Sequence, residues 1–259
     1  MLLALDIGNT ETTVGLFAGE RLDGQWRLTT TPQRTPDEWA AMLTASLTQG
    51  GRSTSEVKAA VVASVAPPVT EDVCDAVEKS TGRRPLLVDA RSRLPIKLDV
   101  EEPLTVGADR IVNTLAASRL FGKDTVVVDF GTATTFDCIT ADGRFLGGVI
   151  MPGLRTAAEE LVRKAAKLPA TELTPPERTI GRRTEDCIRA GVLFGTADAV
   201  DGLVRRIKKE WPGGGTPQVV ATGGLARVVA PLCREIEAVH PDLTLVGLRI
   251  AATALGLTW

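Results

Sequence analysis

Two stretches of the chain place an aspartate, a glycine and small hydroxyl residues directly after an apolar run. They read LALDIGNTETT, residues 3 to 13, and VVDFGTATT, residues 127 to 135. Glycine allows a sharp turn that brings bare backbone N–H groups close to phosphate oxygens, and threonine hydroxyls add short donors. Both stretches therefore predict a turn that binds phosphate.

The two stretches also resemble each other. When Asp6 is aligned with Asp129, 123 positions later, the matches include Gly8 with Gly131 and Thr12 with Thr135. Either turn alone would be read as an ordinary hairpin, because Asp, Asn and Gly favour such turns. A repeat half a chain apart favours a duplicated phosphate-binding fold instead.

The two aspartates indicate that a cation takes part. A carboxylate beside a bound polyphosphate is repulsive unless a cation, or water around it, lies between them. We therefore expect metal-dependent phosphate chemistry near Asp6 and Asp129. The chain contains neither a Walker A loop nor G-x-G-x-x-G after a strand, so a nucleotide would be held in another way.

A third candidate lies in VGADRIVNTLAASRLF, residues 106 to 121, whose apolar residues recur at helical spacing. The segment from Gly107 to Arg110 falls at the start of this helix. Asp109 in the first turn would offset the helix dipole. Alternatively it projects into a cleft between lobes, where it could act as a base beside the cation Arg110.

The elements that position these residues alternate between apolar strands and helices, which predicts an α/β fold. Nine strands are expected near 2–6, 12–17, 25–30, 57–65, 125–130, 134–140, 144–150, 218–222 and 243–246. A helix at 36–48 begins with a capping box from Thr35 to Glu38. A second helix is expected from about Thr70, after Pro67 and Pro68 stop the preceding strand. Residues 172–183 and 213–215 are expected to form a loop and a turn.

Composition narrows the function further. A chain of 259 residues with net charge −2 and scattered basic residues gives no sign of a nucleic-acid or membrane partner. Four widely spaced cysteines without a C-x-x-C pair suit buried thiols in a reducing cytoplasm. The only histidine, His240, precedes Pro241 and is expected at a surface or turn, so a general base is expected to be a carboxylate.

Five motifs in order resemble the type III pantothenate kinases of the acetate-kinase, hexokinase, Hsp70 and actin superfamily. They are DIGNT at 6–10, GADR at 107–110, DFGTATT at 129–135, GGVIMPG at 147–153 and TGG at 222–224. The resemblance implies two ribonuclease-H-like lobes, a duplicated actin-like ATPase fold with a central cleft, here expected at residues 1–117 and 118–259. It also implies ATP-dependent phosphorylation of pantothenate, the first step of coenzyme A biosynthesis, by a homodimer.

The resemblance also implies roles for individual residues. Asp109 matches the proton acceptor, and Asp129 is similar to a ligand of a monovalent cation, K⁺ or NH₄⁺, while Mg²⁺ accompanies ATP. The substrate-binding positions are Gly107, Ala108, Asp109, Arg110 and Thr184, the last of which is also a good N-cap. The ATP-binding positions are Asp6, Ile7, Gly8, Asn9, Thr10, Glu11, Thr12, Thr13, Thr132, Gly223 and Gly224.

The resemblance has one departure and leaves alternatives open. The family commonly carries a tyrosine where Val100 stands, which puts pantothenate affinity in question because a hydrogen bond is lost. The expected mechanism is direct in-line transfer to the pantothenate hydroxyl, with Asp109 taking the proton late, a role compatible with an ordinary low carboxylate pKa. The alternatives are a kinase with another carboxylate-bearing acceptor, a non-catalytic transcriptional regulator of the same fold, and a structural ATPase module. Gly191, Gly195 and Gly202 within one helix suit either a dimer interface or packing inside one subunit.

Overall fold

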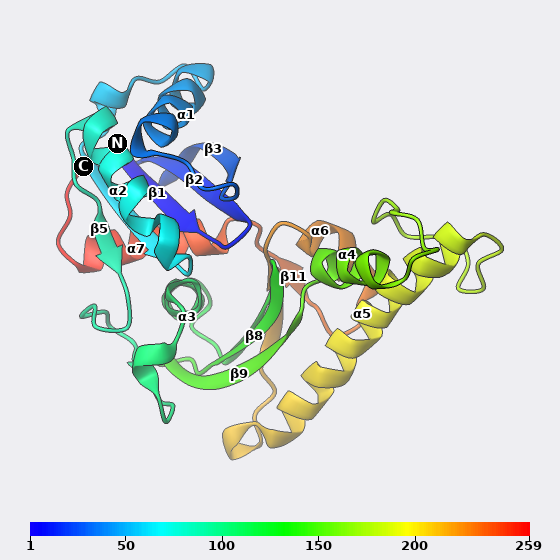
Figure 1. Ribbon diagram of the computed structural model, residues 1–259. Helices are drawn as coiled ribbons and strands as arrows, with labels where there is room; N and C mark the ends of the chain where they lie inside the picture. Colours follow the sequence, from blue (N-terminus) through cyan, green and yellow to red (C-terminus); the bar gives the residue numbers. More distant parts are fainter. The chain divides into compact units, whose positions relative to one another are not determined.

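The computed structural model describes residues 1–259, and the chain forms two units (Figure 1). Unit 1 comprises Met1–Arg119 and Leu243–Trp259, and unit 2 comprises Leu120–Asp242. The chain first passes from unit 1 to unit 2 between Arg119 and Leu120, two residues beyond the expected boundary at 117/118. The structure differs at the C-terminus, because residues 243–259 return to unit 1 rather than completing the second lobe.

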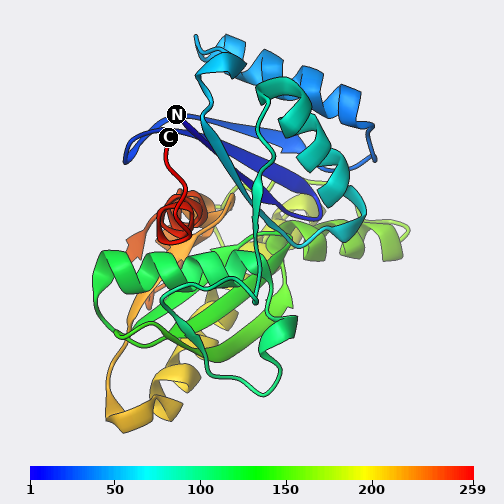
Figure 2. The same cartoon turned by 90° about the vertical axis from the view of Figure 1, so that its left-hand side faces the viewer.

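Unit 1 is built on five strands. They are β1 (Leu2–Ile7), β2 (Glu11–Ala18), β3 (Arg21–Thr29), β4 (Ala59–Ser64) and β5 (Leu86–Val88). Their order is β3-β2-β1-β4-β5, with antiparallel pairs from β1 to β3 and parallel pairs from β1 through β4 to β5. Both termini belong to this unit and lie near each other in both views (Figures 1 and 2).

Helices cover both faces of this sheet. Side chains alternate across a strand, so Leu3 and Leu5 of β1 pack with α1 (Pro36–Gln49) and α2 (Pro67–Thr81). Leu2 and Ala4 pack on the other face with α3 (Ala108–Phe121) and α7 (Leu243–Ala254). Burial on both faces explains why β1 reads as a continuous apolar run. Asp6 continues the alternation of Leu2 and Ala4 and so belongs to the α3 and α7 face.

The first two helices test the expected helix starts. The capping box of α1 is confirmed: Glu38 N–H donates to Thr35 Oγ1 at 3.4 Å and Thr35 N–H to Glu38 Oε2 at 2.8 Å. The expected start of the second helix near Thr70 is wrong, because α2 begins at Pro67. Proline is tolerated in the first helical turn, where its missing N–H would have no intrahelical partner.

Unit 2 repeats the strand order of unit 1. Its strands are β7 (Thr125–Phe130), β8 (Ala133–Ile139), β9 (Arg144–Pro152), β10 (Gln218–Thr222) and β11 (Ala238–Val239), ordered β9-β8-β7-β10-β11. Helices α4 (Leu154–Lys164), α5 (Thr184–Glu210) and α6 (Ala226–Val229) contribute Leu154, Leu193 and Val229 to a core on one face of the sheet. The predicted duplicated α/β fold is confirmed. Short elements complete the chain: β6 (Lys97–Leu98) and the 3₁₀ turns η1 (Thr54–Glu56), η2 (Pro103–Thr105), η3 (Pro212–Gly214) and η4 (Ala230–Leu232).

The strand expected at 243–246 is instead the start of helix α7. Its buried residues Leu245, Leu248 and Ala252 recur at helical spacing and pack with residues of β1, β4 and α3 within unit 1. Gly247 allows this helix to approach α3 closely, because a Cβ at Gly247 would lie 2.2 Å from Val112 O. Thr244 Oγ1 also donates to the buried Asn113 Oδ1 at 2.9 Å. Helix α7 therefore supports α3 from the C-terminal end of the sequence.

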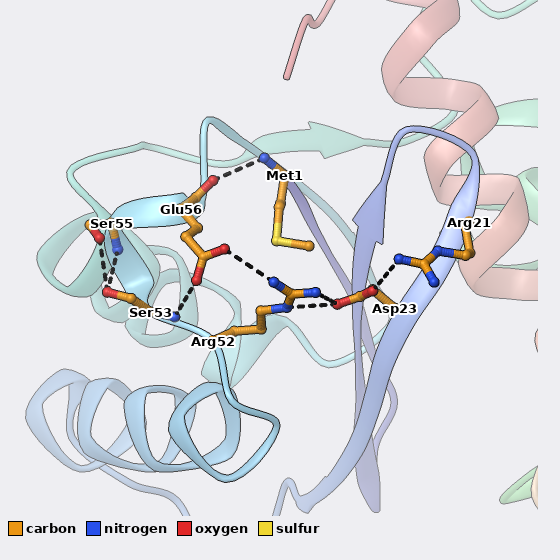
Figure 3. A network of polar contacts seen from close by, with 7 residues as sticks. All are labelled: Met1, Arg21, Asp23, Arg52, Ser53, Ser55 and Glu56. Carbon is orange, nitrogen blue, oxygen red and sulfur yellow. Dashed lines mark hydrogen bonds and ion pairs between the residues drawn. The ribbon is translucent and has the colours of Figure 1, made fainter.

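A polar network holds the amino-terminal end of β1 in place (Figure 3). The terminal amino group of Met1 donates to Glu56 O at 2.9 Å. The Arg52 guanidinium bonds to Asp23 at 2.8 Å and to Glu56 at 3.5 Å. Arg52 holds the pKa of Asp23 below its ordinary value, so this carboxylate stays ionised as it ties β3 to the loop before β4. No helix of the structure is both long and apolar enough to cross a membrane.

Candidate active site

The first predicted phosphate turn connects β1 to β2. Gly8 N–H donates to Glu11 O at 3.1 Å, which leaves Asn9 and Thr10 exposed at the tip. A Cβ at Gly8 would lie 2.8 Å from Glu11 O, so the turn closes this tightly only with glycine. Of the remaining predicted positions, Ile7 and Thr12 are buried, and Asp6, Glu11 and Thr13 are half-buried.

The second turn, between β7 and β8, is one residue shorter. Gly131 N–H donates to Ala133 O at 3.1 Å, and Thr132 is exposed at the tip. Asp6 pairs with Thr13 in the first hairpin and Asp129 with Thr135 in the second. The ungapped match of Thr12 with Thr135 is therefore wrong by one position, since Thr12 corresponds to Thr134.

Asp129 lies at the end of β7, beside the end of β10. Its register neighbour in β10 is Thr222, so their side chains share one face of the sheet. A Cβ at Gly223, whose φ is +91°, would lie 2.3 Å from Asp129 Oδ1. Gly223 is thus required both by its backbone conformation and by the carboxylate next to it. Gly224 is exposed at the following position.

The surroundings of Asp129 suit a cation bound by oxygen atoms. The Thr222 hydroxyl is fully buried and has no hydrogen-bond partner. A carboxylate, a hydroxyl and the space left by Gly223 form an oxygen-rich cradle, which hard cations prefer. No group of three or more His, Cys, Asp or Glu side chains is placed to hold a metal ion. A cation here would therefore take the rest of its ligands from backbone, water or substrate.

The predicted base and the first turn lie at the same edge of the unit 1 sheet. Val65, just after β4, donates its N–H to Ile7 O at 3.0 Å, at the end of β1. A Cβ at Gly107 would lie 3.3 Å from Val65 Cγ1 and 2.5 Å from Asp109 Oδ1. Gly107 therefore packs on Val65, and the Asp109 carboxylate folds back over Gly107. Both features lie at the carboxyl ends of β1 and β4.

The environment of Asp109 changes its acidity. Removal of the carboxyl group from water raises its pKa above the ordinary value, and this effect outweighs a 2.8 Å bond from Arg110 N–H and the Arg110 charge. A raised pKa makes the carboxylate a stronger base, which suits a proton acceptor.

The other predicted substrate positions are distributed over both units. In unit 1, Ala108 is buried in the first turn of α3, and Arg110 and Val100 are half-buried. In unit 2, Thr184 is exposed as the first residue of α5. Its expected role as N-cap is wrong, because the N-cap position falls on Arg183 and no side chain caps this helix end.

The residues that support the two turns were missed by the sequence analysis. The buried Thr30 hydroxyl donates to Gly8 O at 2.8 Å, and Thr30 N–H donates to Thr10 O at 2.8 Å. In unit 2, Gly153 N–H and Thr156 Oγ1 donate to Thr132 O at 3.1 and 2.7 Å. Gly153 was already visible as the last residue of GGVIMPG. Thr30 and Thr156 belong to no recognised motif and are identified only by their contacts.

Two other features lie outside this group. Alanine at Gly191, Gly195 or Gly202 of α5 would place its Cβ in open space, so these glycines do not serve close packing inside one subunit. A cavity of about 500 Å³ lies at the opposite end of β4, where Lys58, Arg83 and Arg84 form part of its wall. Arg84 is already paired with three carboxylates of α2, namely Glu71, Asp75 and Glu78.

The chain is similar to known proteins over nearly its whole length. The family model for type III pantothenate kinase matches residues 2–206. A type III pantothenate kinase of Thermomicrobium roseum is 44% identical over 251 residues, covering 97% of this chain and 96% of the relative. That of Moorella thermoacetica is 43% identical over 250 residues, covering 96% and 98%.

A solved structure supports the fold. It is of a Campylobacter jejuni protein assigned to the Baf family of transcriptional activators, with a TM-score of 0.60 and 97% of each chain covered. At 18% identity this likeness concerns the fold alone and does not favour a regulatory role. The full-length identity to the kinases and the matching family model show that the chain belongs to the type III pantothenate kinase family.

Proposed function

We propose that this protein transfers the γ-phosphoryl group of ATP directly to the primary hydroxyl of pantothenate, with Asp109 as the proton acceptor. The product is 4'-phosphopantothenate, and the reaction is the first step of coenzyme A biosynthesis. The observation that carries the assignment of the base is local to unit 1. The contacts of Val65 with Ile7 and Gly107 bring the Asp109 carboxylate to the sheet edge that carries the first phosphate turn.

In the proposed step, the pantothenate oxygen attacks the γ-phosphorus in line with the leaving oxygen. The new P–O bond forms as the bond to ADP breaks, and the hydroxyl proton passes to Asp109. Because the transition state is loose, positioning and charge neutralisation supply most of the rate, and the base supplies about 10²- to 10⁴-fold. The raised pKa of Asp109 assists this transfer.

The two turns would hold the phosphates through their backbone N–H groups and hydroxyls. The first contributes the segment from Asp6 to Thr13, and the second contributes Thr132. The buried hydroxyl of Thr12 is bonded to Thr30 Oγ1 at 3.0 Å, so Thr12 would act by supporting the turn. Gly223 and Gly224 would form the adenosine side, where missing side chains allow close approach.

Arg110 would bind the pantothenate carboxylate through its planar guanidinium, together with Gly107, Ala108 and Thr184. This bidentate pairing favours acceptors that carry a carboxylate. Val100 cannot replace the hydrogen bond of a tyrosine hydroxyl. The absence of this tyrosine hydroxyl would weaken pantothenate binding by about tenfold, the equivalent of one hydrogen bond.

Asp129, with Thr222 beside it, would hold a monovalent cation, K⁺ or NH₄⁺, and Mg²⁺ would arrive with ATP. The bound cations would neutralise charge on the phosphates. We propose that the enzyme is cytoplasmic and forms a homodimer. The dimer is supported by Gly191 and Gly195, which leave an exposed stripe on α5 where another helix could approach closely. A mass measurement in solution tests the dimer, and a monomer at all concentrations would refute it.

The decisive experiment measures ADP release from ATP and Mg²⁺, with and without pantothenate, in potassium and in sodium buffer. We expect turnover that requires pantothenate and falls sharply in sodium. Asp109→Asn should retain ATP binding and lose about 10²- to 10⁴-fold in kcat. The exposed Glu102→Gln, in the preceding loop, is the matched control and should behave as wild type.

Each outcome separates one part of the proposal. Pantothenate-dependent turnover that is equal in potassium and sodium buffer would support the kinase activity and refute the role of Asp129 in binding the cation. Near-normal turnover of Asp109→Asn would refute the assignment of the base. Folded protein that binds ATP but gives no pantothenate-dependent ADP would refute pantothenate as the acceptor.

A further inference from the structure

Each of the two phosphate turns accepts the same kind of backbone hydrogen bond, although the residues that donate it differ. In unit 1 the residue after β3, Thr30, donates its N–H to Thr10 O, and in unit 2 the residue after β9, Gly153, donates its N–H to Thr132 O. These positions are equivalent, since β3 pairs Thr29 with Glu11 and β9 pairs Pro152 with Ala133. In each unit, the residue that follows the third strand therefore donates a backbone hydrogen bond to a carbonyl oxygen of the phosphate turn.

A threonine hydroxyl adds a second bond to each turn. Thr30 Oγ1 donates to Gly8 O at 2.8 Å, and Thr156 Oγ1 of α4 donates to Thr132 O at 2.7 Å. Thr30 is only 2% exposed and also lies 3.0 Å from Thr12 Oγ1. Because the Thr30 proton goes to the Gly8 carbonyl, Thr12 must be the donor in the contact between the two hydroxyls.

These bonds determine where the turn N–H groups point. In a planar trans peptide the C=O and the N–H point in opposite directions. Holding Gly8 O against Thr30 therefore directs the N–H of Asn9 away from Thr30. In the same way, the bonds to Thr10 O and Thr132 O direct the N–H groups of Glu11 and Ala133 away from their supports. An anion site requires backbone N–H groups held in a fixed direction, and these bonds fix the direction of all three.

We propose that Thr30 and Thr156 are positioning residues for nucleotide binding: their hydroxyls lock the peptide planes of the two phosphate turns so that the N–H groups face the phosphates. This inference rests on the proposed role of the turns in binding ATP. Neither threonine needs to touch the nucleotide. The hydroxyl, rather than the size of the side chain, carries the effect.

The test compares variants that remove the hydroxyl with variants that keep it. Thr30→Val preserves the shape and removes the donor, whereas Thr30→Ser keeps the donor. Thr29→Val, one residue earlier on an exposed position, is the matched control. Binding of a non-hydrolysable ATP analogue is measured by calorimetry, with KM for ATP and for pantothenate determined separately and melting curves recorded.

We expect Thr30→Val to bind the analogue about tenfold more weakly, as for one lost hydrogen bond, and to raise KM for ATP but not for pantothenate. Thr30→Ser and Thr29→Val should remain within about twofold of wild type. The amide signals of Asn9 and Glu11 should shift in the NMR spectrum of Thr30→Val even without nucleotide. A purely structural role would lower the melting temperature without this selective change in ATP affinity.

Thr156 keeps the test open if Thr30→Val does not fold. Thr156 is exposed on a helix, so Thr156→Val should fold. This variant should also bind the ATP analogue several fold more weakly than wild type. Thr253→Val is its control, because Thr253 is an exposed helical threonine bonded to Arg249 O of its own helix. Wild-type affinity in folded Thr30→Val, or in Thr156→Val where Thr30→Val is not obtained, would overturn the inference. Wild-type protein that binds no analogue would refute the ATP role of the turns themselves.

Discussion

Replacement of Gly153 by alanine should disturb the second phosphate turn directly. Gly153 has an ordinary φ of −67°, so the backbone itself would accept alanine. The added Cβ would lie 2.3 Å from Thr132 O and 2.5 Å from Gly131 O. The first distance is 0.7 Å inside the 3.0 Å that real Cβ atoms keep. Both neighbours are backbone atoms, so the turn itself must move.

The size of the effect follows from that movement. Overpacking of this kind costs about 1–3 kcal/mol, which corresponds to a fall in melting temperature of roughly 2–12 °C for a chain of this size. A displacement approaching 1 Å in a substrate-positioning element costs up to about 100-fold in rate. We therefore expect Gly153→Ala to lower kcat/KM for ATP by about 10- to 100-fold, with a smaller effect on KM for pantothenate.

Thermal melting and initial-rate kinetics measure the two parts separately. Gly131→Ala is the matched control for stability, because it places a methyl group in the same turn with nearest atoms at 3.4 and 3.7 Å, which are ordinary contacts. Its melting temperature should fall much less. Wild-type melting temperature and wild-type ATP kinetics in Gly153→Ala would show that the turn yields without cost and would refute the reasoning.

Two further predictions concern α3. The folded-state pKa of Asp109 is raised, so its ionised form costs stability above that pKa, and the cost disappears as the pH falls below the ordinary value of 3.8. Asp109→Asn should therefore melt at a higher temperature than wild type near pH 7 and lose that advantage near pH 3; a lower melting temperature at pH 7 would contradict the raised pKa. Gly247→Ala would place a Cβ 2.2 Å from Val112 O. It should therefore lower the melting temperature and also reduce kcat, because a displaced α3 would move Asp109. An unchanged kcat would show that α7 does not position the base.

Features that depend on local sequence were predicted well. The hairpin strands, the capping box of α1 and the duplication around Asp6 and Asp129 follow from alternation, caps and short motifs, and each is present. Residues 243–246 were misread, because four residues of Leu, Thr, Leu and Val fit a strand as well as a helix. Only the spacing over the whole of α7 distinguishes the two.

Features that depend on contacts between distant residues could not be predicted. The one-residue difference between the turns is invisible without the strand registers, so Thr12 was matched to the wrong threonine. The raised pKa of Asp109 depends on how much water the fold removes from it. Thr30 supports a turn 22 positions away, and no local pattern marks it.

The difference between the two supports has a structural cause. In unit 1 the chain runs from Thr30 through Thr35 before α1 begins, so Thr30 is free to use its own side chain beneath the longer turn. In unit 2 helix α4 begins directly after Gly153, which is its N-cap, and the shorter turn lies against it. No side chain fits at that position, and the hydroxyl comes instead from Thr156 in the first turn of α4. The positive end of this helix then lies beside Thr132, where it favours a bound anion. Both units thus hold the carbonyl of the threonine at the turn tip, Thr10 or Thr132, by a backbone N–H, whereas the hydroxyl bond goes to Gly8 O in unit 1 and to Thr132 O in unit 2.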